Sequence, residues 1–263
     1  MHNETLHFAH ANGFPGGTYN SLLDRFRDRY NVIAIEKLGH NPRYPVDNNW
    51  SSLADELIAY LEDETSEPVI GVGHSLGSLV TFIAAWKRPD LFKSIIMLDP
   101  PFVTGIWGAL FKLFKLTGLA DRITPAGQSS GRKSSWNHMD EVNNYLSSKK
   151  LFQGFDSVCL RDYISHGIEA CNQGLCLSYD VDIEVEIFRT MPDNMGTYRR
   201  PLPIPGSLVY GERSNAVHIP TLKKFTGRHG LRLTTAQGGH LFPLEKPQET
   251  AEVLFRELDI LSL

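Results

Sequence analysis

A serine held between two glycines is the residue whose setting most clearly predicts chemistry. Ser75 lies in GVGHSLGS, where Gly73 and Gly77 flank it in the pattern G-x-S-x-G. An apolar run precedes this stretch and an amphipathic run follows it, which places Ser75 at a strand-to-helix turn, where a nucleophilic serine exposes its hydroxyl. Because a serine hydroxyl is a weak nucleophile, a base must lie within hydrogen-bond reach of it.

His240 is the best-placed base among the ten histidines. It stands in GGHLFPLEKP, after the last predicted strand and before the last predicted helix. The rival interpretation of Gly71 and Gly73 as the start of a dinucleotide-binding G-x-G-x-x-G fails, because that motif needs glycine where this chain has Leu76. The pair Ser75 and His240 therefore predicts nucleophilic catalysis.

Such catalysis also needs backbone amides that point at the negative charge developing on the substrate oxygen. Leu76, directly after the serine, supplies one candidate amide. The loop HANGFPGG after the first predicted strand supplies the other, because Gly13 permits a close backbone approach. We expect Phe14 to be the donor in this loop, since Pro15 has no N–H.

The elements that must position these residues follow from alternating patterns. Short apolar runs, which predict buried parallel strands, cover residues 6–11, 31–37, 68–74, 93–99, 206–212 and 231–237. Helical patterns cover residues 51–63, 76–88, 219–226 and 247–258. The alternation stops after residue 99 and resumes near residue 205. We therefore expect an α/β core, residues 1–102 and 203–263, interrupted by a mainly helical cap, residues 103–202.

The stretches HANGFPG, GHSLG and GGHLFPLEKP, in this order and at these strand ends, resemble the serine-hydrolase, esterase- and lipase-like branch of the α/β-hydrolase superfamily. The resemblance covers residues 5–102 and 204–260. It implies a mostly parallel central sheet flanked by helices, a helical cap inserted after the fourth strand, and hydrolysis of an ester, thioester or carbon–carbon bond without a cofactor. Because little chain precedes the first strand, we expect the usual N-terminal hairpin to be missing and the sheet to have about six strands.

The catalytic acid departs from the family pattern, in which G-x-x-D after the fifth core strand commonly provides it. In GERSNAVH the matching position is Ser214. Asp99, at the end of the neighbouring strand, is our first candidate for the residue that orients His240. Glu212 is the second, and Asn215 the third, because a neutral amide cannot stabilise an imidazolium by charge.

The cap predicts part of the substrate. In IWGALFKLFKLTGL, residues 106–119, a helical arc of apolar side chains faces away from Lys112 and Lys115. The arc comprises Trp107, Leu110, Phe111, Leu113, Phe114 and Leu116. We expect Trp107, Phe111 and Phe114 to line a pocket that favours an apolar acyl or aromatic group.

Composition excludes several other functions. The formal net charge is −4 and no dense Lys/Arg run is present, so nucleic acid is not an expected partner. The sequence has no eighteen-residue apolar run and no basic segment followed by an apolar leader, so we expect neither a membrane span nor export.

The odd count of cysteines, Cys159, Cys171 and Cys176, argues against a disulfide framework and favours a cytoplasmic protein. The set His166, Cys171 and Cys176 fits no usual zinc spacing and lacks a fourth ligand, so we expect no metal.

The sequence therefore predicts a serine hydrolase that acts on a carboxylic ester or thioester of a small, fairly apolar acyl substrate through an acyl-enzyme. One alternative of a different class stays open. The missing acid in residues 211–218 would also suit a receptor-like binding protein on a hydrolase fold, with little or no turnover. The natural substrate and the oligomeric state are not predicted.

Overall fold

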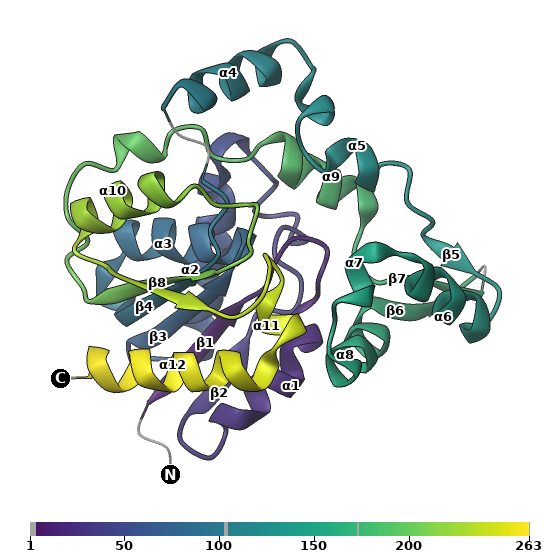
Figure 1. Cartoon of the computed structure of the whole chain (residues 1–263), viewed down its shortest axis with the longest axis horizontal. Helices are drawn as coiled ribbons and strands as arrows, with labels where there is room; N and C mark the ends of the chain where they lie inside the picture. The colour runs from purple at the N-terminus through teal and green to yellow at the C-terminus, as the bar shows by residue number, and fades with distance from the viewer. Residues whose placement is uncertain (1–3, 103–104, 173, 263) are drawn as a thin grey trace.

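The centre of the protein is a six-stranded parallel sheet (Figure 1). The computed structural model describes residues 4–102, 105–172 and 174–262. The strand order is β2-β1-β3-β4-β8-β9, and every neighbouring pair is parallel. The strands are β1 (Thr5–Ala9), β2 (Asn31–Ala34), β3 (Val69–His74), β4 (Phe92–Leu98), β8 (Gly206–Gly211) and β9 (Arg232–Ala236). This confirms the predicted fold class and the expected number of strands.

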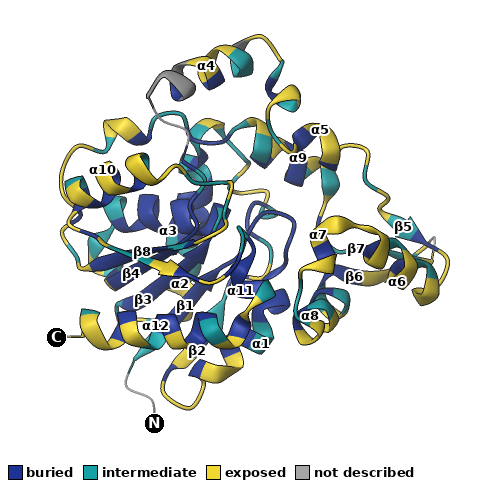
Figure 2. Cartoon of the chain, viewed as in Figure 1, coloured by how far each residue is buried: buried dark blue, intermediate teal, exposed yellow. Residues whose placement is uncertain are grey.

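Helices cover both faces of the sheet, and two apolar cores result. One core joins the sheet to α2 (Ser51–Glu64), α3 (Leu76–Lys87) and α10 (Ile219–His229). The other joins it to α1 (Asn20–Leu23) and α12 (Pro247–Leu261). Figure 2 shows the strands as the buried centre of the molecule. Because both faces are covered, the central strands are apolar along their whole length rather than in alternation, which explains why runs such as VIGVGH predicted them.

The segment between β4 and β8 contains most of the remaining structure. Its helices are α4 (Gly105–Leu116), α5 (Ala126–Ser129), α6 (Met139–Ser148), α7 (Lys150–Gln153), α8 (Ser157–Gly167) and α9 (Val181–Arg189). It also holds a small antiparallel sheet in the order β5-β7-β6, formed by β5 (Ser135–Trp136), β7 (Gly174–Leu177) and β6 (Ile168–Cys171). The helical character was expected, but the small sheet was not, because strands of two to four residues are too short for a clear period-two pattern.

The cysteines of this segment correct one expectation. Cys171 and Cys176 form a disulfide, with their Cα atoms 5.9 Å apart. The two residues lie on β6 and β7, which pair as a hairpin. Pairing of the strands thus brings together two thiols that an odd count had led us to expect unpaired. Cys159 is a free, buried cysteine.

Short elements complete the fold. Helix α11 (Phe242–Glu245) precedes α12. The 3₁₀ helices are η1 (Gly16–Tyr19), η2 (Asp24–Phe26), η3 (Asn48–Trp50), η4 (Pro89–Leu91), η5 (Ala120–Arg122) and η6 (Met195–Thr197). Within the described residues, no helix combines the length and apolar character needed to cross a membrane.

Candidate active site

Ser75 occupies the sharp turn between β3 and α3. Its backbone angles are φ 52° and ψ −113°, a strained conformation for a residue with a side chain. Both flanking glycines are needed for this turn. A Cβ atom at Gly73 would lie 2.3 Å from the carbonyl oxygen of Gly77, and one at Gly77 would lie 2.1 Å from that of Ala9. The G-x-S-x-G pattern is therefore a packing requirement, and it places the Ser75 hydroxyl at the carboxyl end of the sheet.

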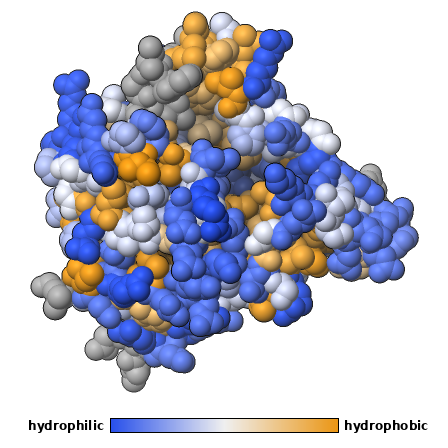
Figure 3. All heavy atoms as spheres, viewed as in Figure 1, coloured by the Kyte–Doolittle hydropathy of each residue, from blue (hydrophilic) through white to orange (hydrophobic). Residues whose placement is uncertain are grey.

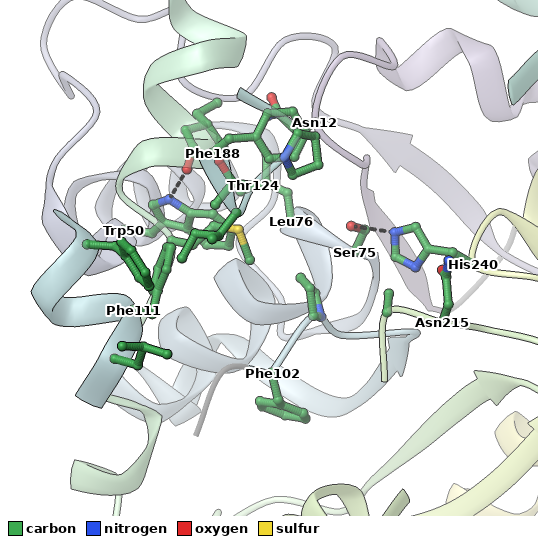
Figure 4. Close-up of a pocket in the computed structure, with 18 residues that line it drawn as sticks. Asn12, Trp50, Ser75, Leu76, Phe102, Phe111, Thr124, Phe188, Asn215 and His240 are labelled. Atoms are coloured by element: carbon green, nitrogen blue, oxygen red, sulfur yellow. Dashed lines mark hydrogen bonds between the residues drawn. The ribbon is translucent and has the colours of Figure 1, made fainter. Parts of the chain in front are cut away.

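The structure brings the predicted serine, histidine and first-choice acid together. His240 Nε2 lies 3.0 Å from Ser75 Oγ, and His240 Nδ1 lies 2.6 Å from Asp99 Oδ2. Figure 4 shows the imidazole of His240 turned toward the Ser75 hydroxyl. The His240 side chain is 26% exposed and that of Asp99 is 0% exposed. The three side chains thus form one continuous series of hydrogen bonds from a buried carboxylate to a hydroxyl at the cavity.

Asp99 follows β4 and is held by donors from the neighbouring strand end. The Gly211 N–H donates to Oδ1 at 2.8 Å, and the Ser214 hydroxyl donates to Oδ2 at 2.5 Å. The backbone of Asp99 is left-handed, with φ 45°, a conformation that aspartate tolerates better than most residues. A carboxylate out of contact with water is costly unless hydrogen bonds replace its hydration, and here three donors do so.

Neither of the two weaker acid candidates holds His240 within the described residues. Glu212 is exposed, and its carboxylate bonds Arg213 at 3.0 Å, so the structure does not place it at His240. Glu212 comes directly after the last residue of β8, where the chain leaves the sheet, and its neighbour Arg213 is exposed as well. Asn215 lines the cavity beside the site, but the acceptor of the His240 Nδ1 proton is Asp99.

His74 holds the backbone of His240. Its Nε2 lies 2.9 Å from the His240 carbonyl oxygen, and its Nδ1 lies 2.7 Å from the Tyr19 hydroxyl. Burial, followed by the proximity of His240, lowers the pKa of His74 to about 3, so its ring is neutral. Because a carbonyl oxygen only accepts, His74 donates from Nε2, and its Nδ1 accepts from Tyr19.

The prediction for the oxyanion loop needs a correction. The Phe14 amide already donates to the Ala11 carbonyl at 3.1 Å, and its ring packs against Phe155, with ring centroids 5.9 Å apart. Residues 11–14 form a tight turn, with Gly13 at φ 80°. In such a turn the fourth residue donates to the first, while the amide of the second stays free. The amide of Asn12, not that of Phe14, is therefore available.

Asn12 and Leu76 both line the cavity next to Ser75. Within the described residues, the structure gives neither of their backbone amides a protein acceptor. The Asn12 side chain anchors the loop, because its Nδ2 donates to the Glu184 carbonyl at 2.9 Å. The Asn12-Gly13 pair was the sequence signal for this turn. In a four-residue turn that begins at Ala11, the Phe14 N–H donates to the Ala11 carbonyl, which leaves the Asn12 N–H free.

The cavity at Ser75 has a volume of about 700 Å³. Phe111 and Phe114 line it, whereas the side chain of Trp107, the third residue expected at a substrate pocket, lies outside the described residues. None of the described lining side chains is charged. The apolar lining residues are Trp50, Leu76, Pro101, Phe102, Leu110, Phe111, Phe114, Ile123, Pro125, Ile187, Phe188, Met191 and Ala216.

Comparison with known proteins decides the family. Residues 8–253 match the family model described as the alpha/beta hydrolase family. The chain belongs to the alpha/beta hydrolase family. This agrees with the strand order, the turn at Ser75 and the position of His240.

Relatives of this alpha/beta hydrolase are named for different functions. Karrikin insensitive 2 receptor IA of Petunia hybrida is 25% identical over 97% of this chain and 90% of the relative. The 2-(acetamidomethylene)succinate hydrolase of Mesorhizobium japonicum is 29% identical over 35% of this chain and 34% of the relative. The crystal structure of E-2-(acetamidomethylene)succinate hydrolase has a TM-score of 0.79 at 22% identity, with 97% of this chain and 91% of that chain covered. At this identity the structural likeness shows the fold alone.

Proposed function

We propose that this alpha/beta hydrolase is a serine hydrolase that cleaves a carboxylic ester or thioester of an apolar acyl group. The observation that carries the proposal is the unbroken series of hydrogen bonds from Asp99 through His240 to Ser75. A base within 3.0 Å of a serine hydroxyl is the arrangement that serine nucleophiles require.

The proposed first half-reaction forms an acyl-enzyme. His240 Nε2 takes the proton of Ser75 as Oγ attacks the substrate carbonyl carbon, and Asp99 stabilises the resulting imidazolium. The oxyanion accepts hydrogen bonds from the backbone amides of Asn12 and Leu76, and each such donor contributes roughly 10²- to 10³-fold in rate. His240 then gives its proton to the leaving alcohol or thiol as the tetrahedral intermediate collapses.

The second half-reaction releases the acid. His240 takes a proton from a water molecule, whose oxygen attacks the acyl carbon, and the same two amides stabilise the second oxyanion. The proton returns from His240 to Ser75 Oγ as the acyl bond breaks. The products are a carboxylic acid and free enzyme, so the cycle needs no redox partner.

The cavity supports an apolar acyl group of medium length. Phe111 and Phe114 from α4 and Met191 after α9 give it hydrophobic walls, and its volume of about 700 Å³ is in the range of small-molecule sites. A carboxylate on the acyl group would lose its hydration without gaining a charged partner among the described lining residues. The succinate in the name of the Mesorhizobium relative therefore does not suit this cavity.

A series of p-nitrophenyl esters tests this proposal. We expect kcat/KM to rise about fourfold with each added methylene, which corresponds to about 0.8 kcal/mol, until the cavity is full. The p-nitrophenyl monoester of succinic acid should react at least about 100-fold more slowly than the uncharged pentanoate ester of similar size. Equal or better turnover of the charged ester, or no turnover of any ester, would contradict the proposal.

A receptor-like role is the second candidate, since one relative named as a receptor is similar over 97% of this chain. A binding protein of this kind would be stabilised by a small ligand, with a higher melting temperature at saturation, but would not turn over any ester at a useful rate. Measuring thermal stabilisation and hydrolysis on the same ester panel separates the two functions.

A further inference from the structure

The turn that holds the Asn12 amide is bonded from two directions. At its start, the Ala11 N–H donates to the hydroxyl of Tyr19 at 3.3 Å, which ties this end to the core. At Asn12 itself, Nδ2 donates to the main-chain carbonyl of Glu184 at 2.9 Å, and Oδ1 has no hydrogen-bond partner within the described structure. Among the described residues, the one hydrogen bond of this side chain therefore runs to α9, in the segment between β4 and β8.

The Glu184 side chain packs against the next residue of the turn. A Cβ atom at Gly13 would lie 3.0 Å from Glu184 Cδ and 3.2 Å from both carboxylate oxygens. Ser129 donates to Oε1 at 2.7 Å, and Arg132 Nη1 donates to Oε2 at 2.5 Å. The Glu184 side chain is 6% exposed and that of Arg132 is 18% exposed. A largely buried ion pair thus lies against the turn that carries the Asn12 amide.

Arg132 joins this ion pair to a further helix. Its Nη2 donates to the hydroxyl of Tyr163 at 3.0 Å. The Tyr163 ring is buried and packs against the ring of Phe14, the last residue of the turn, with ring centroids 5.7 Å apart. Side chains from α8 and α9, and Arg132 after α5, therefore meet at residues 11–14.

We infer that Arg132 and Glu184 are positioning residues for the oxyanion. Their ion pair fixes the turn that presents the Asn12 amide, and it neutralises the carboxylate that lies against this turn. The inference rests on the proposed function, because it takes the Asn12 amide as a donor to the oxyanion. It predicts that this part of the β4–β8 segment sets the rate for every ester, whereas the walls from α4 select among esters.

The positioning follows from the geometry that an oxyanion needs. A backbone amide stabilises the oxyanion only when it lies at hydrogen-bond distance from the place where that oxygen forms. The Asn12 side chain is bonded to α9 at Glu184, and the ion pair in turn holds Glu184 to Arg132. Loss of the pair should loosen the turn, and a misplacement of about 1 Å can cost about 100-fold in rate.

The neutralisation follows from the sign of the intermediate. Attack on the substrate carbonyl places negative charge on the oxygen beside the Asn12 amide. A second negative charge nearby opposes this, and more strongly where water is excluded. In the wild type, the guanidinium of Arg132 balances the carboxylate of Glu184. Without Arg132, the carboxylate against Gly13 should disfavour the oxyanion and slow both half-reactions.

Two single variants break the same ion pair and leave charges of opposite sign. We expect Arg132→Met to lower kcat by about 10- to 100-fold for acetate and octanoate esters alike, with KM unchanged, because the cavity walls stay in place. Glu184→Gln leaves a positive charge and should lower kcat by less than about fivefold. The matched control is Lys133→Met, since Lys133 bonds Glu141 at an exposed position, and it should leave kcat unchanged.

The double variant Arg132→Met/Glu184→Gln carries neither charge. Its kcat should be at least about tenfold above that of Arg132→Met. Full kcat in folded Arg132→Met would overturn the inference, and a double variant as slow as Arg132→Met would overturn the role of charge. A loss of more than about tenfold in folded Glu184→Gln would overturn that role too, even where Arg132→Met is too unstable to assay.

An alkyl trifluoromethyl ketone separates stabilisation of the oxyanion from binding of the substrate. Ser75 Oγ adds to the ketone carbon, its proton passes to His240, and the ketone oxygen becomes the oxyanion. We expect the inhibition constant to rise in Arg132→Met by the factor by which kcat/KM falls. Residues that only support the fold would lower the melting temperature without this parallel change, so an unchanged inhibition constant would overturn the positioning role.

Hydrogen exchange keeps this inference distinct from the proposed function. The Phe14 amide donates to the Ala11 carbonyl and should exchange slowly while the turn is closed. We expect its exchange to become at least about fivefold faster in the double variant, while the Ser75 amide, bonded to Leu98, keeps its rate. If the wild type neither hydrolyses esters nor adds the ketone, the proposed function fails. Unchanged exchange at Phe14 would overturn the positioning role separately.

Discussion

The two sides of the cavity are built in different ways. On the sheet side, the reacting groups follow strand ends, and the Asp99 side chain is 0% exposed with three hydrogen-bond donors. On the other side, α4 contributes apolar side chains, of which Leu110 is 38% and Leu113 55% exposed. Figure 3 shows apolar side chains gathered over this part of the molecule. The sheet side is packed into the core, whereas α4 on the other side leaves part of its outer, apolar face exposed to solvent.

One polar anchor ties α4 to the rest of the protein. Lys115 bonds Asp193 at 2.8 Å and Asn48 at 2.7 Å, and both charged side chains are largely buried. The sequence pattern placed Lys115 with Lys112 opposite the apolar arc, and it did not predict these two partners. If the proposed function is correct, the contrast between the two sides predicts that chemistry and substrate choice are separable in this protein. Substitutions at the sheet side should change kcat for every ester, and substitutions in α4 should change which ester is preferred.

The largest effect is expected at the sheet side. Ser75→Ala should lower kcat by about 10⁵- to 10⁶-fold for acetate and octanoate esters alike, because the nucleophile serves every acyl group. Ser147→Ala, at an exposed position in α6, is the control and should leave kcat unchanged. A loss in Ser75→Ala that depends strongly on acyl length would break the separation of the two sides.

Removal of a ring from α4 should change preference instead. Phe111 is 3% exposed and lines the cavity. We expect Phe111→Ala to lower kcat/KM about 10- to 100-fold for the octanoate ester, because a large apolar contact is lost, and by less than about threefold for the acetate ester. Uniform loss over the ester series would show that α4 supports the reacting groups as well.

Loss of the ion pair between Lys115 and Asp193 should lower the stability of the protein. Lys115→Met leaves the Asp193 charge without its partner, and we expect about 3 kcal/mol lower free energy of unfolding by denaturant titration. Lys112→Met, on the exposed face of the same helix, is the matched control and should change this by less than about 0.5 kcal/mol. If both variants behave alike, the buried ion pair does not hold α4.

The smallest expected effect is a pH dependence of the free energy of unfolding, which arises from buried histidines on the sheet side. Burial lowers the pKa of His7 to about 3, of His10 to about 4 and of His74 to about 3. Because these rings are neutral in the folded state and take up protons on unfolding, they favour folding fully above pH 6.5 and progressively less as the pH falls. Below pH 6.5, each of these rings lowers the free energy of unfolding by up to about 1.4 kcal/mol for each pH unit.

His7→Phe tests one of these rings. Neither His7 nitrogen has a hydrogen-bond partner within the described structure, so the substitution breaks no hydrogen bond there. Between pH 6 and pH 4 its free energy of unfolding should depend on pH by about one proton less than that of wild type. Ser147→Ala, a change of a non-titrating side chain at an exposed position, should leave the slope as it is. An unchanged slope in His7→Phe would show that His7 is not neutral in the folded state.

The sequence predicted the sheet because its signals are local. Runs such as KSIIMLD have the composition of buried parallel strands, and all six of these strands were expected. The pair Ser75 and His240 stood out because each follows a strand and precedes a helix. Features that depend on distant partners could not be predicted in this way. The bonds of Ser214 to Asp99 and of Lys115 to Asp193 join segments far apart in the chain.

The oxyanion loop shows a different limit. We proposed that it follows β1, and choosing between the amides of Asn12 and Phe14 as its donor required the hydrogen bonds of the turn. The Cys171–Cys176 disulfide was missed because the pairing of β6 with β7 leaves only a weak trace in the sequence. In each case the residue type was informative, and the geometry decided its role.

Labelling by a fluorophosphonate, measured by intact mass, tests the central claim most directly, because it requires an activated serine and no knowledge of the substrate. We predict rapid addition of one probe molecule to the wild type, no addition to Ser75→Ala or His240→Ala, and slow addition to Asp99→Asn. A folded wild type that stays unlabelled, or labelling that persists in Ser75→Ala, would contradict the claim that Ser75 is an activated nucleophile.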